Sequence, residues 1–64
     1  MRNTLKVERA ILDITQEELA NKIGVSRQTI NSIEKNRYVP STELALKLSR
    51  VFSKPVNNFF KLDE

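Results

Sequence analysis

A polar stripe between residues 27 and 35 holds the side chains with the clearest capacity for chemistry. At about 100° per residue along a helix, these side chains gather on the side opposite Ile30 and Ile33. None of them is a carboxylate, whereas a helix face that meets only water commonly mixes Glu with Lys. The stripe consists of Gln28, Asn31, Ser32 and Lys35, with Arg27 beside it at the helix start.

Side chains of these types match the edges of base pairs in duplex DNA. Asn and Gln can pair bidentately with adenine, and Arg with guanine, in the major groove. Each good pair discriminates between bases by about 1–3 kcal/mol. We therefore expect base contacts from Arg27, Gln28, Asn31 and Ser32.

A second set of residues surrounds the stripe and would fix the register of the protein on the phosphate backbone. One of them begins the preceding helix, where free N–H groups can face a phosphate. For Tyr38 there is an alternative, a loop aromatic that covers the edge of the core. The residues expected at the DNA backbone are Gln16, Ser26, Thr29, Lys35, Asn36, Arg37 and Tyr38.

The residues before the stripe carry the signals of two short helices that meet at a sharp corner. Thr15 and Glu18 have the spacing of a capping box, which predicts a helix over residues 16–23. Gly24 is the only glycine in the chain, and it can end that helix because it adopts a positive φ without steric cost. Ser26 then caps the helix of the stripe. Two helices joined in this way have helix-turn-helix geometry.

Hydrophobic spacing predicts helices almost throughout the rest of the chain. A first helix is expected over residues 4–12, although Glu8 occupies a position where an apolar residue would fit better. A fourth helix follows Ser41. A fifth is expected from Pro55, since apolar residues then recur at helical spacing. The last four residues could be a frayed helix end or a short strand.

Length and composition limit the function classes further. The 64 residues make one domain, and 11 Lys and Arg against eight Asp and Glu give a net charge of +3. There is no Cys and no His, so we expect no disulfide, no metal and no cofactor. We also expect no catalytic residues and no small-molecule substrate, and hence not an enzyme. The lack of a long apolar run predicts a cytoplasmic protein at the nucleoid, without a membrane partner.

The apolar tail suggests that two copies associate. A chain of this length buries only about 60% of the surface that its unfolded form exposes. The tail carries Phe59, Phe60 and Leu62, which we expect at the interface of a homodimer. The alternative is that these side chains close the bottom of the monomer core.

Two runs of the sequence are similar to a known family. The run ITQEELANKIGVSRQTINSIEK, residues 14–35, resembles LTQEELAxxxGVSRQTIxxIE of the Xre family, the helix-turn-helix domains of phage-repressor and Cro type. The run NRYVPSTELALKLSRVFSKPVNNFF, residues 36–60, resembles the end of the same domain. The resemblance implies an all-α, five-helix, lambda-repressor-like domain over residues 1–64, with the helix-turn-helix at about 16–35. A short β pairing of the termini is a variant of this fold.

The resemblance also implies a function and roles for single residues. It implies a transcriptional regulator, usually a repressor, that binds a pseudo-palindromic operator in double-stranded DNA as a homodimer. Gln16 would clamp a phosphate. Matching positions place Arg27, Gln28 and Ser32 toward bases, and Lys35, Arg37 and Tyr38 by the backbone.

Two positions depart from the family pattern. Asn36 stands where many members have glycine, whose backbone conformation Asn can adopt, and Glu8 replaces a common leucine. A second function class also stays open, namely an antitoxin or other protein-interaction module built on the same fold. RNA is a weaker expectation because exposed aromatic side chains for base stacking are missing.

Overall fold

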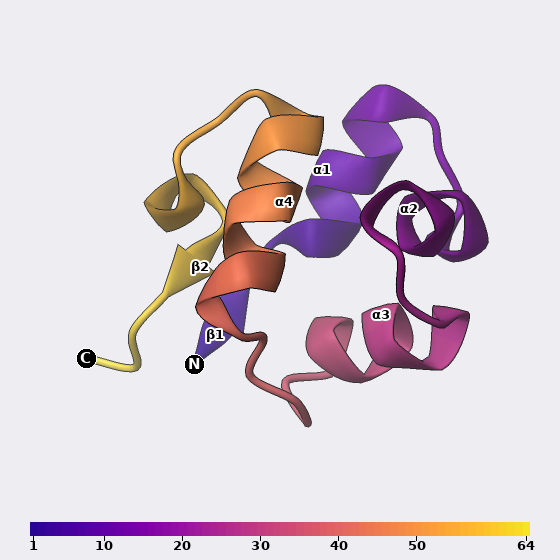
Figure 1. Ribbon diagram of the computed structural model, residues 1–64. Helices are drawn as coiled ribbons and strands as arrows, with labels where there is room; N and C mark the ends of the chain where they lie inside the picture. Colours follow the sequence, from indigo (N-terminus) through magenta and orange to yellow (C-terminus); the bar gives the residue numbers. More distant parts are fainter.

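The computed structural model covers residues 1–64 and consists of helices with a small sheet at one end (Figure 1). The α-helices are α1 (Leu5–Leu12), α2 (Gln16–Ile23), α3 (Arg27–Glu34) and α4 (Thr42–Phe52). The other elements are the 3-10 turn η1 (Val56–Asn58) and the strands β1 (Arg2–Asn3) and β2 (Phe60–Lys61). No helix combines the length and the hydrophobicity that a bilayer crossing requires.

The predicted helices over 4–12, 16–23 and 27–35 and the helix after Ser41 are confirmed, but the fifth is not an α-helix. The chain makes only one 3-10 turn after Pro55, whose ψ of 150° is extended. Phe59 and Phe60 follow, and both are buried. The chain at Phe60 pairs with Asn3 of the N-terminal strand, so its backbone is committed to a sheet and not to a helix. The chain therefore leaves the helix and extends into β2.

The corner between α2 and α3 forms through the predicted caps. Thr15 Oγ1 accepts the Glu18 N–H at 3.0 Å, and the Thr15 N–H donates to Glu18 Oε1 at 2.9 Å. Gly24 ends α2 at φ 76°, in the left-handed region. Ser26 Oγ then accepts the Thr29 N–H at 3.2 Å and caps α3. These local bonds fix where both helices begin and end.

The core lies between the four α-helices and is closed by the residues after η1. Phe52 and Phe59 meet edge to face, with ring centroids 5.2 Å apart. Phe59 is fully buried and Phe60 is 6% exposed. The prediction that Phe59 and Phe60 form a dimer surface is therefore wrong for the bulk of these side chains, because the monomer core already contains them. Leu62 alone of the three is exposed, at 69%.

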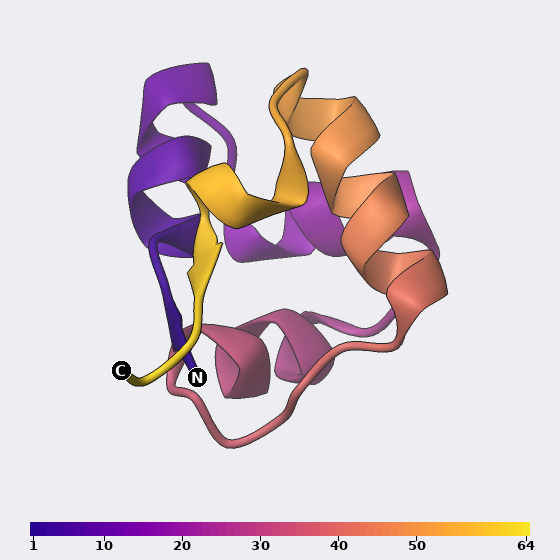
Figure 2. The same cartoon turned by 90° about the vertical axis from the view of Figure 1, so that its left-hand side faces the viewer.

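The two ends of the chain lie side by side. β1 and β2 pair antiparallel, with Arg2 opposite Lys61 and Asn3 opposite Phe60. Beyond the strands, the Met1 ammonium donates to Asp63 Oδ2 at 2.6 Å. Figure 2 shows both termini close to the loop between α3 and α4. The short β pairing considered for the termini is thus present.

The unusual Glu8 is buried and has a partner. Lys54 Nζ donates to Glu8 Oε1 at 2.8 Å, and the Glu8 side chain is 9% exposed. A buried carboxylate needs such a partner, since an unpaired charge in the interior is costly. The pair fastens α1 to the segment between α4 and η1. It accounts for how the fold tolerates a charge at this position.

Candidate nucleic-acid interface

The helix α3 is held by one apolar side and leaves its other side open. Ile30 is fully buried and Ile33 is 1% exposed, so these two side chains anchor α3 to the core. Figure 1 shows α3 at the lower edge of the molecule, with no element below it. The sharp corner at Gly24 sets α3 across the end of α2. The result is a rigid helix whose polar side faces outward.

The expected base-contacting residues all lie on or beside this outer side. Arg27 and Gln28 are exposed, while Asn31 and Ser32 are half-buried. Lys35 directly follows the helix and is exposed. The structure therefore places the polar stripe at the surface, although Asn31 and Ser32 are more enclosed than an unobstructed helix face implies.

An open hollow of about 340 Å³ lies between α3 and the loop that follows it. Tyr38 is 43% exposed and lines this hollow. The hollow gathers hydroxyl, amide and guanidinium groups from the helix and the loop. Its lining residues are Gln28, Thr29, Ser32, Arg37 and Tyr38.

A second open hollow, of about 480 Å³, lies where α2 and α3 begin. Arg27 and Gln16 border it, and Glu17 is the one carboxylate there. The first N–H groups of a helix have no acceptor within the helix, so the start of α2 offers free donors on this side. An anion such as a phosphate would meet these donors and the Arg27 side chain.

The hydroxyls of Ser26 and Thr29 are partly committed to each other. Ser26 Oγ lies 3.0 Å from Thr29 Oγ1, and one of the two hydroxyls donates to the other. Ser26 Oγ also accepts the Thr29 N–H as the cap of α3. One hydroxyl hydrogen of the pair remains free, which is enough for a single contact to a phosphate oxygen.

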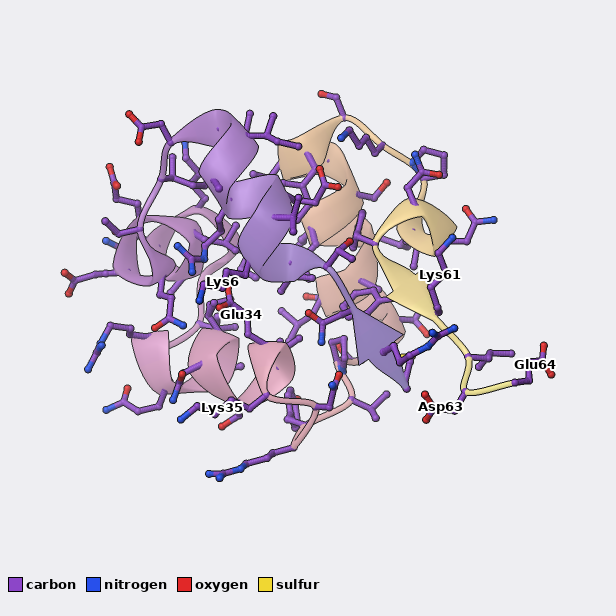
Figure 3. The ribbon with its side chains drawn as sticks, turned by 180° about the vertical axis from the view of Figure 1, so that it is seen from behind. Lys6, Glu34, Lys35, Lys61, Asp63 and Glu64 are labelled. Carbon is purple, nitrogen blue, oxygen red and sulfur yellow. The ribbon has the colours of Figure 1, made fainter.

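The only carboxylate of α3 is turned away from the polar stripe. Glu34 lies on the side of α3 that faces α1, whereas Lys35 lies on the opposite side (Figure 3). Arg9 Nε donates to Glu34 Oε2 at 2.6 Å, and Arg9 Nη2 donates to Glu34 Oε1 at 3.2 Å. The hydrogen bond to Glu34 raises the pKa of Arg9, although burial opposes the rise. The Arg9 guanidinium thus holds the only carboxylate of α3 on the inner side of the helix, and the outer face of α3 carries no acid.

Gln16 and Asn31 join this ion pair through their amides. Gln16 Nε2 donates to Glu34 Oε1 at 3.1 Å and to Asn31 Oδ1 at 3.4 Å. Sequence reasoning missed Arg9 and Glu34, which lie 25 positions apart. The sequence does hold one signal for this pair, which is a carboxylate at the end of α3 beside a stripe that has no other acid. Such a carboxylate needs a cation from elsewhere in the fold.

Asn36 ends α3 in the way expected of a residue that replaces glycine. Its φ is 60°, in the left-handed region. Its Oδ1 also accepts from Asn3 Nδ2 at 2.7 Å, and the same Asn3 group donates to the Ile33 carbonyl at 2.8 Å. The N-terminal strand thus ties down the end of α3, from which Arg37 and Tyr38 project.

Two short helices at a tight corner, the second with an exposed face free of unpaired acids, define a helix-turn-helix domain. A family model described as helix-turn-helix matches residues 5–59, which is most of the chain. The chain belongs to this family, in its Xre and Cro type. The sequence resemblance is thereby confirmed.

Curated relatives of similar length support this assignment. An uncharacterised HTH-type transcriptional regulator of Methanocaldococcus jannaschii is 50% identical over 60 residues, which cover 94% of this chain and 91% of that protein. One from Bacillus subtilis is 45% identical over 64 residues, covering 100% and 97%. The transcriptional repressor RstR of the cryptic phage CTXphi in Vibrio cholerae is 40% identical over 52 residues, which cover 81% of this chain and 44% of that protein.

Proposed function

We propose that the protein is a transcriptional repressor that binds a pseudo-palindromic operator in double-stranded DNA as a homodimer, with α3 in the major groove. The observation that carries the proposal is the outer face of α3, where amide, hydroxyl and cationic groups meet no unpaired carboxylate. The membership in a family of DNA-binding regulators supports it, as does the likeness to a phage repressor.

In this proposal two groups of residues contact different parts of the DNA. The outer side of α3 reads base edges through Arg27, Gln28, Asn31 and Ser32. The surrounding residues hold the phosphates and set the register, as backbone contacts do in general. These are Ser26, Thr29, Lys35, Asn36, Arg37 and Tyr38, together with Gln16 through the free backbone N–H groups at the start of α2.

The dimer surface that we propose is an apolar groove between α4, η1 and the N-terminus. The groove has a volume of about 270 Å³, and Met1, Leu46 and Val56 are among its lining residues. Leu46 is 60% exposed and Val39 is 66% exposed, which leaves apolar surface for a second copy to cover. Leu62, the exposed member of the predicted set, lies in the tail beyond β2. Figure 2 shows this tail beside the N-terminus, and Met1 at that terminus lines the groove.

The loop between α3 and α4 connects this groove to the DNA-binding face. Arg37 and Tyr38 line the hollow beside α3, and the next two residues, Val39 and Pro40, line the apolar groove. A two-fold axis at the groove would therefore set two copies of α3 side by side. Half-sites about 34 Å apart, one turn of DNA, are the spacing that such a dimer reads. Occupied DNA would then exclude polymerase from a promoter.

The decisive experiment is selection of bound fragments from random duplex DNA, followed by gel shifts on the enriched sequence. We expect an enriched site with two related half-sites, and light scattering should give the mass of a dimer at micromolar concentration. A pool in which nothing is enriched would reject the proposal and favour the protein-interaction module instead. An enriched site without symmetry would reject the dimer alone.

A further inference from the structure

Both amide hydrogens of Gln16 are directed at acceptors on α3. One points to Glu34 Oε1 at 3.1 Å and the other to Asn31 Oδ1 at 3.4 Å. A glutamine amide has only two N–H donors. The Gln16 side chain therefore has no hydrogen left for a phosphate, and it connects a buried ion pair to a residue of the polar stripe.

The orientation of the Gln16 amide is set by Glu34. An ionised carboxylate only accepts hydrogen bonds, so the Gln16 NH₂ group, and not its carbonyl, must face it. Arg9 fixes the carboxylate with two hydrogen bonds and donates a third to the Ile14 carbonyl at 3.1 Å. The Glu34 side chain is 8% exposed and that of Arg9 is 15% exposed. The anchor of the network is thus shielded from water and held from three sides.

The orientation of the Gln16 amide determines which atom of the Asn31 side chain remains available to a ligand. Its Oδ1 receives the hydrogen bond from Gln16, which places the carbonyl end of the amide toward α2. Its Nδ2 has no acceptor within the protein. Asn31 therefore offers a hydrogen-bond donor to anything that approaches α3.

We propose that Glu34, held by Arg9, is a positioning residue that orients Gln16 and, through it, Asn31, so that Asn31 reads a hydrogen-bond acceptor on the base edge. The inference rests on the proposed function, because it takes α3 to lie in the major groove. The N7 and O6 atoms of guanine, the N7 atom of adenine and the O4 atom of thymine are acceptors there, whereas the N4 amino group of cytosine is a donor. Bidentate pairing with adenine requires a donor and an acceptor side by side, and the Asn31 carbonyl is directed toward Gln16 instead.

The first test uses the free protein and needs no DNA. Hydrogen exchange of side-chain NH₂ groups is measured by NMR, and Gln28 serves as the control within the chain because it is an exposed glutamine. We expect the Gln16 hydrogens to exchange about tenfold more slowly than those of Gln28, since they exchange only when the network opens. Equal rates would overturn the proposal, whatever the protein binds.

The second test uses Gln16→Met, which removes the relay and leaves Arg9 and Glu34 paired. Glu34→Gln is a poorer choice because it leaves Arg9 without its partner and threatens the fold. Random duplex DNA is selected with the wild-type protein and with Gln16→Met. We expect one base pair of the wild-type site to shift its preference toward adenine, since the released Asn31 amide can pair bidentately with it, a change of roughly tenfold in discrimination. Weakening that is uniform at all positions would overturn the relay.

A third variant, Asn31→Asp, replaces the donor by an acceptor of the same shape. We expect it to lose at least about tenfold in affinity for the wild-type site. The matched control is Asn57→Asp, which adds the same charge on the exposed turn η1. Equal losses in both variants would overturn a specific role for Asn31. If the wild-type protein enriches no duplex, the proposed function is wrong. The NMR exchange rates of the free protein still test the hydrogen-bond network of Gln16 independently.

Discussion

The Arg9 guanidinium and the Glu34 carboxylate form a two-pronged ion pair, 2.6 Å apart at the closest atoms, that joins α1 to the last turn of α3. The pair lies beneath the outer face of α3, not on it. It therefore links the stability of the domain to the placement of α3. Its two effects can be separated by mutation.

Arg9→Met should destabilise the domain strongly, because it leaves the Glu34 carboxylate enclosed without its cation. We expect a loss of about 3 kcal/mol in the free energy of unfolding, which urea denaturation would measure. The double variant Arg9→Met, Glu34→Met should recover most of this loss, since apolar side chains often replace a buried pair without cost. Its DNA specificity should nevertheless stay altered, because Gln16 loses its orienting acceptor. A double variant as unstable as the single one would contradict this account.

Gly24→Ala should cost about 1 kcal/mol through backbone strain alone. The φ of Gly24 is 76°, and no atom lies within 4 Å of the position that a Cβ would take. Gly24→Asn should cost less, because Asn tolerates the left-handed region, as Asn36 does at φ 60°. Thermal unfolding of the two variants would show this order. An equal loss for both would point to a cause other than backbone conformation.

Leu46→Glu should convert the dimer into a monomer and leave the fold intact, since Leu46 is 60% exposed in one copy. Ile11→Glu is a matched control, because Ile11 is 62% exposed but lies on α1, outside the apolar groove. Light scattering at micromolar concentration would measure the mass of each variant. If Ile11→Glu gave the monomer and Leu46→Glu the dimer, the interface would have to move to α1.

Gln28→Ala and Lys35→Ala should affect DNA binding in different ways. Gln28→Ala should relax the preference at one base pair, at a cost of about 1–3 kcal/mol on the preferred sequence. Lys35→Ala should weaken all sequences alike and reduce the slope of log affinity against log salt by about one. Lys61→Ala removes the same charge from β2 and should leave the slope unchanged. Gel shifts at several salt concentrations would decide.

The pairing of the termini should weaken in acid. The hydrogen bond from the Met1 ammonium lowers the pKa of Asp63 below its ordinary value. Because the folded pKa is depressed, the stabilisation is present above the unfolded pKa of about 3.9 and is lost as the pH falls through the folded pKa. An NMR titration of the Asp63 carboxyl would show the lowered midpoint. Asp63→Asn should remove this pH dependence from the signals of β1 and β2.

The corner between α2 and α3 could be predicted from the sequence because its signals are local. The capping box of Thr15 and Glu18 and the positive φ of Gly24 each depend on residues within one turn of the chain. The polar stripe followed from helix geometry once the buried Ile30 and Ile33 were recognised. These local features are enough to predict where most of the candidate site lies.

The features that escaped prediction depend on contacts between distant parts of the chain. Glu8 and Lys54 are 46 positions apart, and nothing in their spacing indicates that they meet. The fifth α-helix does not form because the chain at Phe60 pairs with Asn3 at the other end of the sequence, and this pairing overrides the helical spacing of the apolar residues. The burial of Phe59 and Phe60 moved the proposed interface from these phenylalanines to the groove around Leu46.

The antiparallel pairing of β1 with β2 has a practical consequence for handling the protein. Since both ends of the chain emerge at one corner, a tag fused to either terminus would leave from the same place, beside the groove and the loop after α3. A bulky fusion at either end would therefore crowd the proposed contact between two copies before it obstructed the proposed DNA contacts of α3. A short spacer rich in glycine and serine would relieve that crowding by giving the fused partner room to swing clear.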